Sequence, residues 1–168
     1  MHRAVPLLLS LLLPALALAT EPAEGPVRVA FEKPEAYTDA RTDRSHSKGA
    51  SESVTRGLSK FLQRVAPAHL APGQQLEVVF TDIDLAGDYE PGTNLSLHDV
   101  RLVKSIYPPR LTFRWSLLDA NGSVLRQGEE DIRDLGFQTS VSGNDRSPLR
   151  YEQHILRRWL QDTLPRAG

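Results

Sequence analysis

Four short segments alternate apolar and polar residues, which is the pattern of a β-strand with one buried face. In the first, residues 27–31, Val27, Val29 and Phe31 share one side. The others cover residues 76–83, 111–117 and 124–131. The last two flank Asp-Ala-Asn-Gly at 119–122, which has the composition of a hairpin turn. Because 124–131 is the most polar of the four, we interpret it as an edge strand.

Two longer segments carry apolar residues at helical spacing. Within 51–66 they stand at offsets 0, 4, 7, 8 and 11 from Val54, with Ser51 as the expected N-cap and Pro67 as the stop. The second segment runs from about Ser147 to about Thr163. Ser147 followed by Pro148 is typical of an N-cap with proline at the first helical position. Each helix therefore has one apolar stripe to bury.

The order strand, helix, strand, strand, strand, helix predicts an α+β domain. Two helices cannot cover both faces of a four-stranded sheet, so we expect a two-layer sandwich, with both helices on one face of a mainly antiparallel sheet. Residues 98–106 form a further candidate strand, whereas 36–49 and 133–147 lack periodicity and are interpreted as irregular. Phe113, Trp115 and Trp159 lie on the apolar sides of their elements and are expected in the core.

The N-terminus has the three parts of a secretory signal peptide. A basic start at 1–3 precedes an apolar run from Ala4 to Leu18, and Ala17-Leu18-Ala19 is a small-x-small cleavage site. The apolar run is shorter than the roughly 20 residues that span a bilayer. We therefore expect a signal peptide at 1–19, a mobile lead-in at 20–26 and one domain at 27–168. The protein is expected in the periplasm or outside the cell, without stable membrane insertion after cleavage.

Composition removes several functional classes. The 168-residue chain has no cysteine, so disulfides, thiolate metal sites and thiol nucleophiles are excluded. A net charge of −1 provides no general attraction to nucleic acid. The chain lacks Gly-x-Ser-x-Gly, His-Glu-x-x-His and a glycine-rich phosphate loop, and its histidines show no ligand spacing. The sequence leaves enzymatic activity open but favours a protein that is not an enzyme, and it indicates no cofactor.

Residues 82–90 hold the densest group of candidate ligands. Asp82, Asp84, Asp88 and Glu90 follow a strand, and clustered carboxylates suit hard cations. Aligned with an EF-hand loop, however, Thr93 replaces the bidentate glutamate, so no metal site is assigned. The alternative is structural, because aspartate and glycine also form turns.

Arg101 and Arg110 lie in the following segment and complete the set of candidate binding residues. We expect these arginines to neutralise Asp82 and Asp84, which alternation places on one face, with Ile83 on the other.

Several segments together resemble a known family. They are Val29 to Asp39, Thr-Asp-Ile-Asp-Leu-Ala-Gly at 81–87, Asp-Val-Arg at 99–101, Tyr-Pro-Pro-Arg-Leu at 107–111, and Tyr151-Glu152 with Trp159. The chain is thereby similar to small exported proteins of Gram-negative bacteria that share a domain of unknown function. The resemblance implies export and supplies no activity or site residue.

Two functional hypotheses remain. One is a non-enzymatic module that binds another protein of the cell envelope. The other is a small-ligand or cation-binding protein that uses the acidic loop 82–90. The absence of a catalytic motif and the polar loops favour the first.

Overall fold

A computed structural model describes residues 25–42, 49–90, 100–141 and 145–164. The segment interpreted as a signal peptide and residues 20–24 of the lead-in lie outside these described residues, as do residues 98–99 of the candidate strand at 98–106. The rest of the expected domain, apart from its gaps, can be compared with the structure.

The centre of the fold is one open sheet of four strands, in the order β1-β2-β3-β4. The strands are β1 (Val27–Phe31), β2 (Gln75–Asp84), β3 (Arg110–Leu118) and β4 (Val124–Arg133). β1 pairs with β2 in parallel, and the other two pairings are antiparallel. β4 is an edge strand, as its polar sequence predicted.

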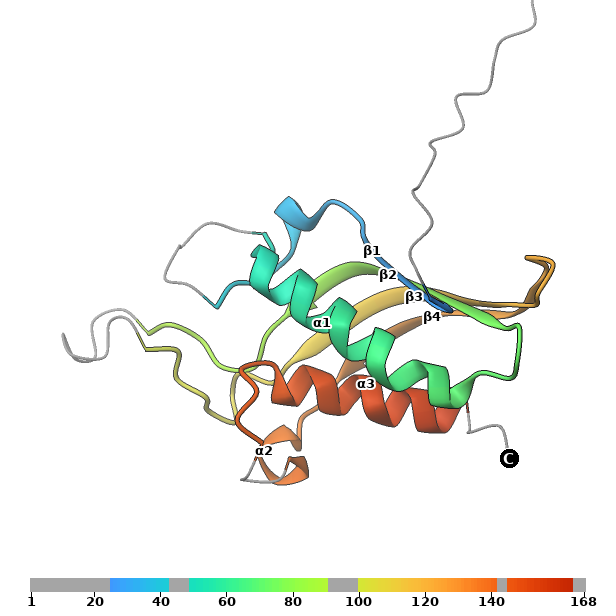
Figure 1. The fold of residues 1–168 in the computed structure, drawn as a ribbon. Coiled ribbons are helices and arrows are strands. Elements are labelled where there is room, and N and C mark those ends of the chain that lie inside the picture. The colour runs from blue at the N-terminus through green and yellow to red at the C-terminus, as the bar shows by residue number, and fades with distance from the viewer. Residues whose placement is uncertain (1–24, 43–48, 91–99, 142–144, 165–168) are drawn as a thin grey trace, which may run out of the picture.

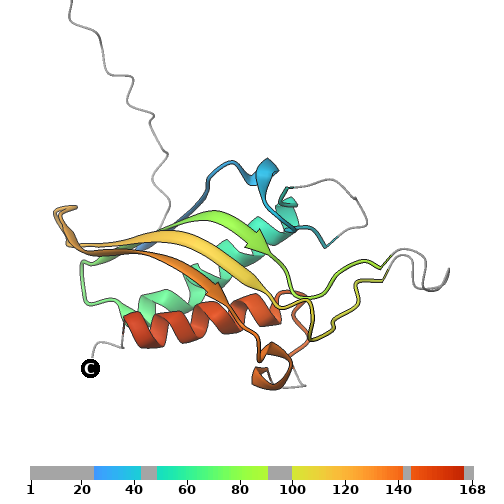
Figure 2. The same ribbon diagram turned by 180° about the vertical axis from the view of Figure 1, so that it is seen from behind.

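Two long helices, α1 (Glu52–Val65) and α3 (Arg150–Thr163), pack against the same face of the sheet (Figures 1 and 2). The strands and the two long helices follow one another along the chain in the expected order, so the α+β class is confirmed. Shorter helical segments are η1 (Pro34–Ala36), η2 (Ala66–His69) and α2 (Phe137–Ser140). No helix of the described residues covers the other face of the sheet, which we call the open face.

The core between the layers contains a cluster of aromatic rings in tilted and edge-to-face contact. Phe113 lies between Phe80 and Trp159, with ring-centroid distances of 5.5 and 4.9 Å. Trp115 contacts Trp159 edge to face at 5.9 Å. Phe113, Trp115 and Trp159 are all buried, which confirms their predicted core positions.

A β-bulge in β2 decides which side chains face this core. Phe80 is opposite Phe113, but Asp82 is opposite Thr112, so Thr81 is an extra residue in the ladder. Strict alternation from Leu76, Val78 and Phe80 would direct Asp82 and Asp84 to the helices. The bulge instead buries Ile83 completely and places both carboxylates on the other side.

Three local expectations were wrong. Residues 100–106 form no strand, and Leu102 makes only an isolated bridge with Asp88. In the described part of 36–49, which is residues 36–42 and 49, two isolated bridges interrupt the expected irregular structure: Asp39 bridges Asp84, and Ala40 bridges Ala50. Within 133–147, interpreted as irregular, residues 137–140 form α2.

The start of the last helix also differs from the expectation. α3 begins at Arg150 rather than beside Ser147. Ser147 still contributes to this start, because its Oγ accepts a hydrogen bond from the Leu149 amide at 3.2 Å. By contrast, Ser51 is the N-cap residue of α1, as predicted.

Candidate functional site

The predicted candidate residues Asp82 and Asp84 lie at the end of β2, beside the chain that follows β1. Asp82 accepts hydrogen bonds from the backbone amide and the hydroxyl of Thr38, both at 2.8 Å. Asp84 is the cross-strand neighbour of Arg110 and bridges Asp39 through the backbone. Asp82 therefore anchors residues 37–39 against the sheet.

Arg101 holds the neighbouring loop together. Its Nη2 is 2.6 Å from Asp39 Oδ2, and its guanidinium also donates to four backbone carbonyls, those of Arg41, Leu85, Ala86 and Gly87. The ring of Tyr89 lies 5.5 Å from the guanidinium carbon. Because only arginine presents this planar set of donors, Arg101 fixes the loop geometry.

Glu152 secures the same loop from the helical side. It is 1% exposed, and its Oε1 accepts a hydrogen bond from the Ala86 amide at 2.8 Å. The other oxygen, Oε2, has no hydrogen-bond partner among the described residues. Burial raises the pKa of Glu152, with the amide of Ala86 and the charge of Arg101 opposing the shift. We call Asp39, Arg101, Glu152 and residues 85–87 the loop anchor.

Gly87 is required for this close packing. Its φ is +83°, a conformation that favours glycine, and an added Cβ would lie 2.8 Å from the Leu102 carbonyl oxygen. The Asp-Leu-Ala-Gly segment thus forms a tight structural turn.

The remaining candidate residues have other partners. The Asp88 carboxylate accepts a hydrogen bond from the Tyr89 amide. The Glu90 carboxylate accepts two hydrogen bonds from Lys104 and one from Tyr107. Arg110 forms a two-pronged ion pair with Asp131, both distances being 2.6 Å. In the described part of the chain, no three carboxylates or histidines gather in a way that could hold a metal ion.

The expected partners of Asp82 and Asp84 differ from those observed. Arg101 forms its ion pair with Asp39, and Arg110 forms its ion pair with Asp131. Asp39 competes successfully for Arg101 because its backbone bridge to Asp84 brings it to the same strand end. The charges of Arg101 and Arg133 still act on Asp84 over a longer range.

Asp84→Asn is expected to weaken the pH dependence of stability between pH about 4 and about 6. Burial, with Asp39 and Asp82 as secondary causes, raises the pKa of Asp84 to about 6. The folded state therefore favours the protonated group, and this contribution, full below the ordinary pKa, is lost as the pH rises to about 6. Urea unfolding across this range measures it. Asp88→Asn, on the exposed turn, is the control, and equal slopes in wild type and Asp84→Asn would contradict the prediction.

Calcium is expected to leave the thermal unfolding midpoint unchanged. Asp82, Asp88 and Glu90 already accept hydrogen bonds from the protein. Thermal melts with a chelator and with increasing calcium test this. A midpoint that rises with the logarithm of calcium concentration would show binding to the folded state and overturn it.

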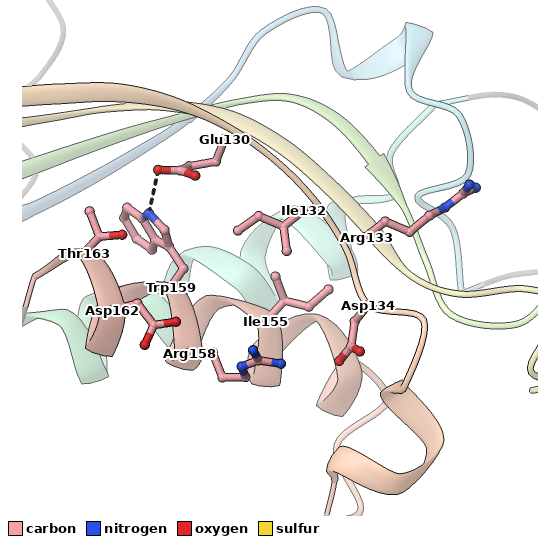
Figure 3. A pocket seen from close by; sticks show the side chains of 9 residues that line it. All are labelled: Glu130, Ile132, Arg133, Asp134, Ile155, Arg158, Trp159, Asp162 and Thr163. Carbon is pink, nitrogen blue, oxygen red and sulfur yellow. Dashed lines mark hydrogen bonds between the residues drawn. The ribbon is translucent and has the colours of Figure 1, made fainter.

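A different site lies where the edge strand β4 meets α3. A pocket of about 280 Å³ opens between them. Figure 3 labels its nine lining residues, which are Glu130, Ile132, Arg133, Asp134, Ile155, Arg158, Trp159, Asp162 and Thr163. We call this the edge pocket.

Two indole rings hold the carboxylate of Glu130 in the edge pocket. Its Oε1 accepts hydrogen bonds from the indole nitrogens of Trp115 at 3.0 Å and Trp159 at 3.3 Å. Gly128 makes room for Trp115, since an added Cβ there would lie 2.8 Å from the indole nitrogen. A carboxylate fixed by two buried rings is a preorganised acceptor for a cation.

Sequence reasoning missed both Glu130 and Glu152. Glu152 was not selected as a candidate residue, although it stands at helical spacing with Ile155, Leu156 and Trp159 on the apolar stripe of α3. That spacing was the available signal. No sequence signal pointed to Glu130, because its indole partners lie on other elements, Trp115 on β3 and Trp159 on α3.

In the part of the chain that the structure describes, the fold and its two sites define an α+β protein with one sheet face free of helices and a pocket beside the terminal strand β4. The chain belongs to the family described as "Protein of unknown function (DUF3016)", whose model matches residues 25–162. Comparisons with curated proteins and with solved structures give no match. Among the described residues, no helix combines the length and apolar character needed to cross a bilayer.

Proposed function

We propose that this protein is exported by a Gram-negative bacterium and acts as a non-enzymatic binding module of the cell envelope, with a partner protein docked at the edge pocket. The observation that carries the proposal is the position of this pocket directly beside β4, the terminal strand of the sheet. A free strand and a neighbouring pocket are the two elements by which sheet edges bind polypeptides.

The outer edge of β4 is available for pairing. β4 pairs only with β3, and no other described segment bridges it. Its exposed side chains include Val124 and Leu125 near the hairpin. The ten-residue length of β4 provides a long row of outward-facing backbone groups.

Export is supported by the signal-peptide pattern at 1–19. The alternative, a small-ligand or cation-binding role for loop 82–90, has less support. Three of its four carboxylates accept hydrogen bonds from within the protein, and the loop anchor gives the surrounding residues a structural role.

Cell fractionation and mass spectrometry test export. We expect the chain in the periplasmic or extracellular fraction with Thr20 as its first residue. Ala19→Arg should block cleavage at this position, because the cleavage site needs a small residue. A cytoplasmic chain that retains Met1 would overturn the export part of the proposal.

Affinity capture from envelope extract tests the binding part. Ile132→Lys places a charged chain in the edge pocket, whereas Gln127→Lys makes the same change on the open face of the same strand. A partner retained by wild type and Gln127→Lys but lost with Ile132→Lys supports the proposal, provided thermal melts show that both variants fold. Equal retention by both variants, or no retained partner with wild type, overturns it.

A further inference from the structure

The edge pocket lies where side chains of an added strand would project. On β4, Glu130 and Ile132 face the helical layer, since they are opposite the buried residues Phe113 and Leu111 of β3. A strand added beyond β4 would run about 4.7–4.9 Å away, with every second side chain on the helical side. Those side chains would enter the space between β4 and α3, which is the edge pocket (Figure 3).

The floor of the edge pocket suits an aliphatic stem. Ile132, Ile155 and Trp159 provide its apolar lining. Ile155 and Trp159 belong to the buried core, so this surface is rigid. Lysine and arginine have stems that pack against such surfaces while the charged end reaches polar groups.

The polar groups of the edge pocket are predominantly acidic. Glu130, Asp134 and Asp162 line it, while Arg133 points away from it in Figure 3. Arg158 is then the cation among the side chains that face the pocket. The excess of carboxylates favours a positively charged occupant, and Glu130, oriented by its two indole donors, gives that charge a fixed partner.

The charges of β4 itself also favour a positively charged ligand. Glu129, Glu130 and Asp131 are consecutive at the middle of the strand. A second copy paired antiparallel about Glu130 would place Glu129 opposite Asp131, and like charges directly opposite each other destabilise a sheet. A basic segment meets no such repulsion.

We infer that the edge pocket and β4 together bind an extended segment of a partner polypeptide that carries lysine or arginine, whose side chain enters the pocket. This inference rests on the proposed function and adds the chemistry of the ligand. The backbone of the segment pairs with β4, and its basic side chain lies over Ile132 with its charge near Glu130 and Asp162.

Peptide titration of the full chain, as purified from the expressing cell, tests the inference. The probes are capped peptides of alternating threonine and valine with a central lysine, and matched peptides with norleucine or glutamate at the centre. NMR follows the backbone amides of β4 and the indole N–H of Trp159. We expect the lysine peptide to shift these signals and to bind about tenfold more tightly than the norleucine peptide, a difference of about 1.4 kcal/mol.

Two variants identify the source of the preference. Asp162→Asn should reduce the advantage of lysine over norleucine, while Glu77→Gln, on the open face, should leave it unchanged. Equal affinity for the lysine and norleucine peptides overturns the basic ligand class. Signals of β4 that shift with protein concentration alone point to a second copy and also overturn the inference.

Absence of binding by every peptide overturns the inference too. The proposed function is judged separately, by the loss of an envelope partner in Ile132→Lys but not in Gln127→Lys. A partner captured in this way, with no peptide bound, would show that the docking site is right and the ligand class is wrong.

Discussion

Phe113→Ala is expected to lower the free energy of unfolding by about 3–5 kcal/mol, the usual cost of removing a buried aromatic side chain. Phe113 is fully buried at the centre of the aromatic cluster, between Phe80 and Trp159. Since domains are stable by only about 5–15 kcal/mol, this change removes a large part of the total. Chemical denaturation monitored by tryptophan fluorescence measures it.

The matched control for Phe113→Ala is Ser116→Ala, on the open face of the same strand. Surface substitutions of this kind usually change stability by no more than about 0.5 kcal/mol. Similar losses in the two variants would contradict the assignment of the faces of β3.

Arg101→Met is expected to destabilise the protein by about 3 kcal/mol, the lower end of the range found when one partner of a buried ion pair is removed, because the Asp39 side chain is 29% exposed. Methionine keeps the aliphatic bulk but provides none of the hydrogen bonds to Asp39 and to the carbonyls of residues 85–87. The Arg101 side chain is only 14% exposed, so water replaces these donors poorly. Arg101→Lys should restore little, because an ammonium group cannot reach all of the acceptors.

Arg114→Met is the control for Arg101→Met. Arg114 also forms an ion pair, with Glu32, but both side chains are nearly half exposed. Exposed pairs of this type contribute little to stability, because water screens the two charges. If Arg114→Met and Arg101→Met shift the denaturation midpoint equally, the loop anchor does not have the structural role described above.

Elements with one uniform face were predictable from the sequence. β3 alternates without interruption from Leu111 to Leu117, and α1 keeps its stripe from Val54 to Val65. Local periodicity reports burial on one side, so it found both elements and the aromatic core. The edge position of β4 followed from its polar composition for the same reason.

Long-range partners were not predictable in this way. Arg101 and Asp39 are 62 positions apart, and Glu152 and Ala86 are 66 apart. No local window contains both members of either pair. The candidate residues were therefore chosen by their density in 82–90, whereas the structure distributes them among partners from four parts of the chain.

The edge pocket was missed for a related reason. Its residues come from β4 and α3, each of which was identified correctly as an element. The sequence does not show how α3 lies relative to β4, and that relative position creates the pocket. In the sequence, Glu130 therefore did not differ from the other polar residues of the edge strand.

The extra residue Thr81 makes β2 tolerant of a change in length at that point. A substitution at position 81 leaves the ladder on both sides in register, with Phe80 opposite Phe113 and Asp82 opposite Thr112. Loss of this single residue would remove the bulge and keep those pairs, because Asp82 would then follow Phe80 directly. Asp82 and Asp84 would stay on the open face, and Ile83 would stay on the buried face, since regular alternation from Phe80 gives the same sides. In a deletion scan of this chain, position 81 should therefore tolerate removal, unlike the paired positions of β2 that precede it.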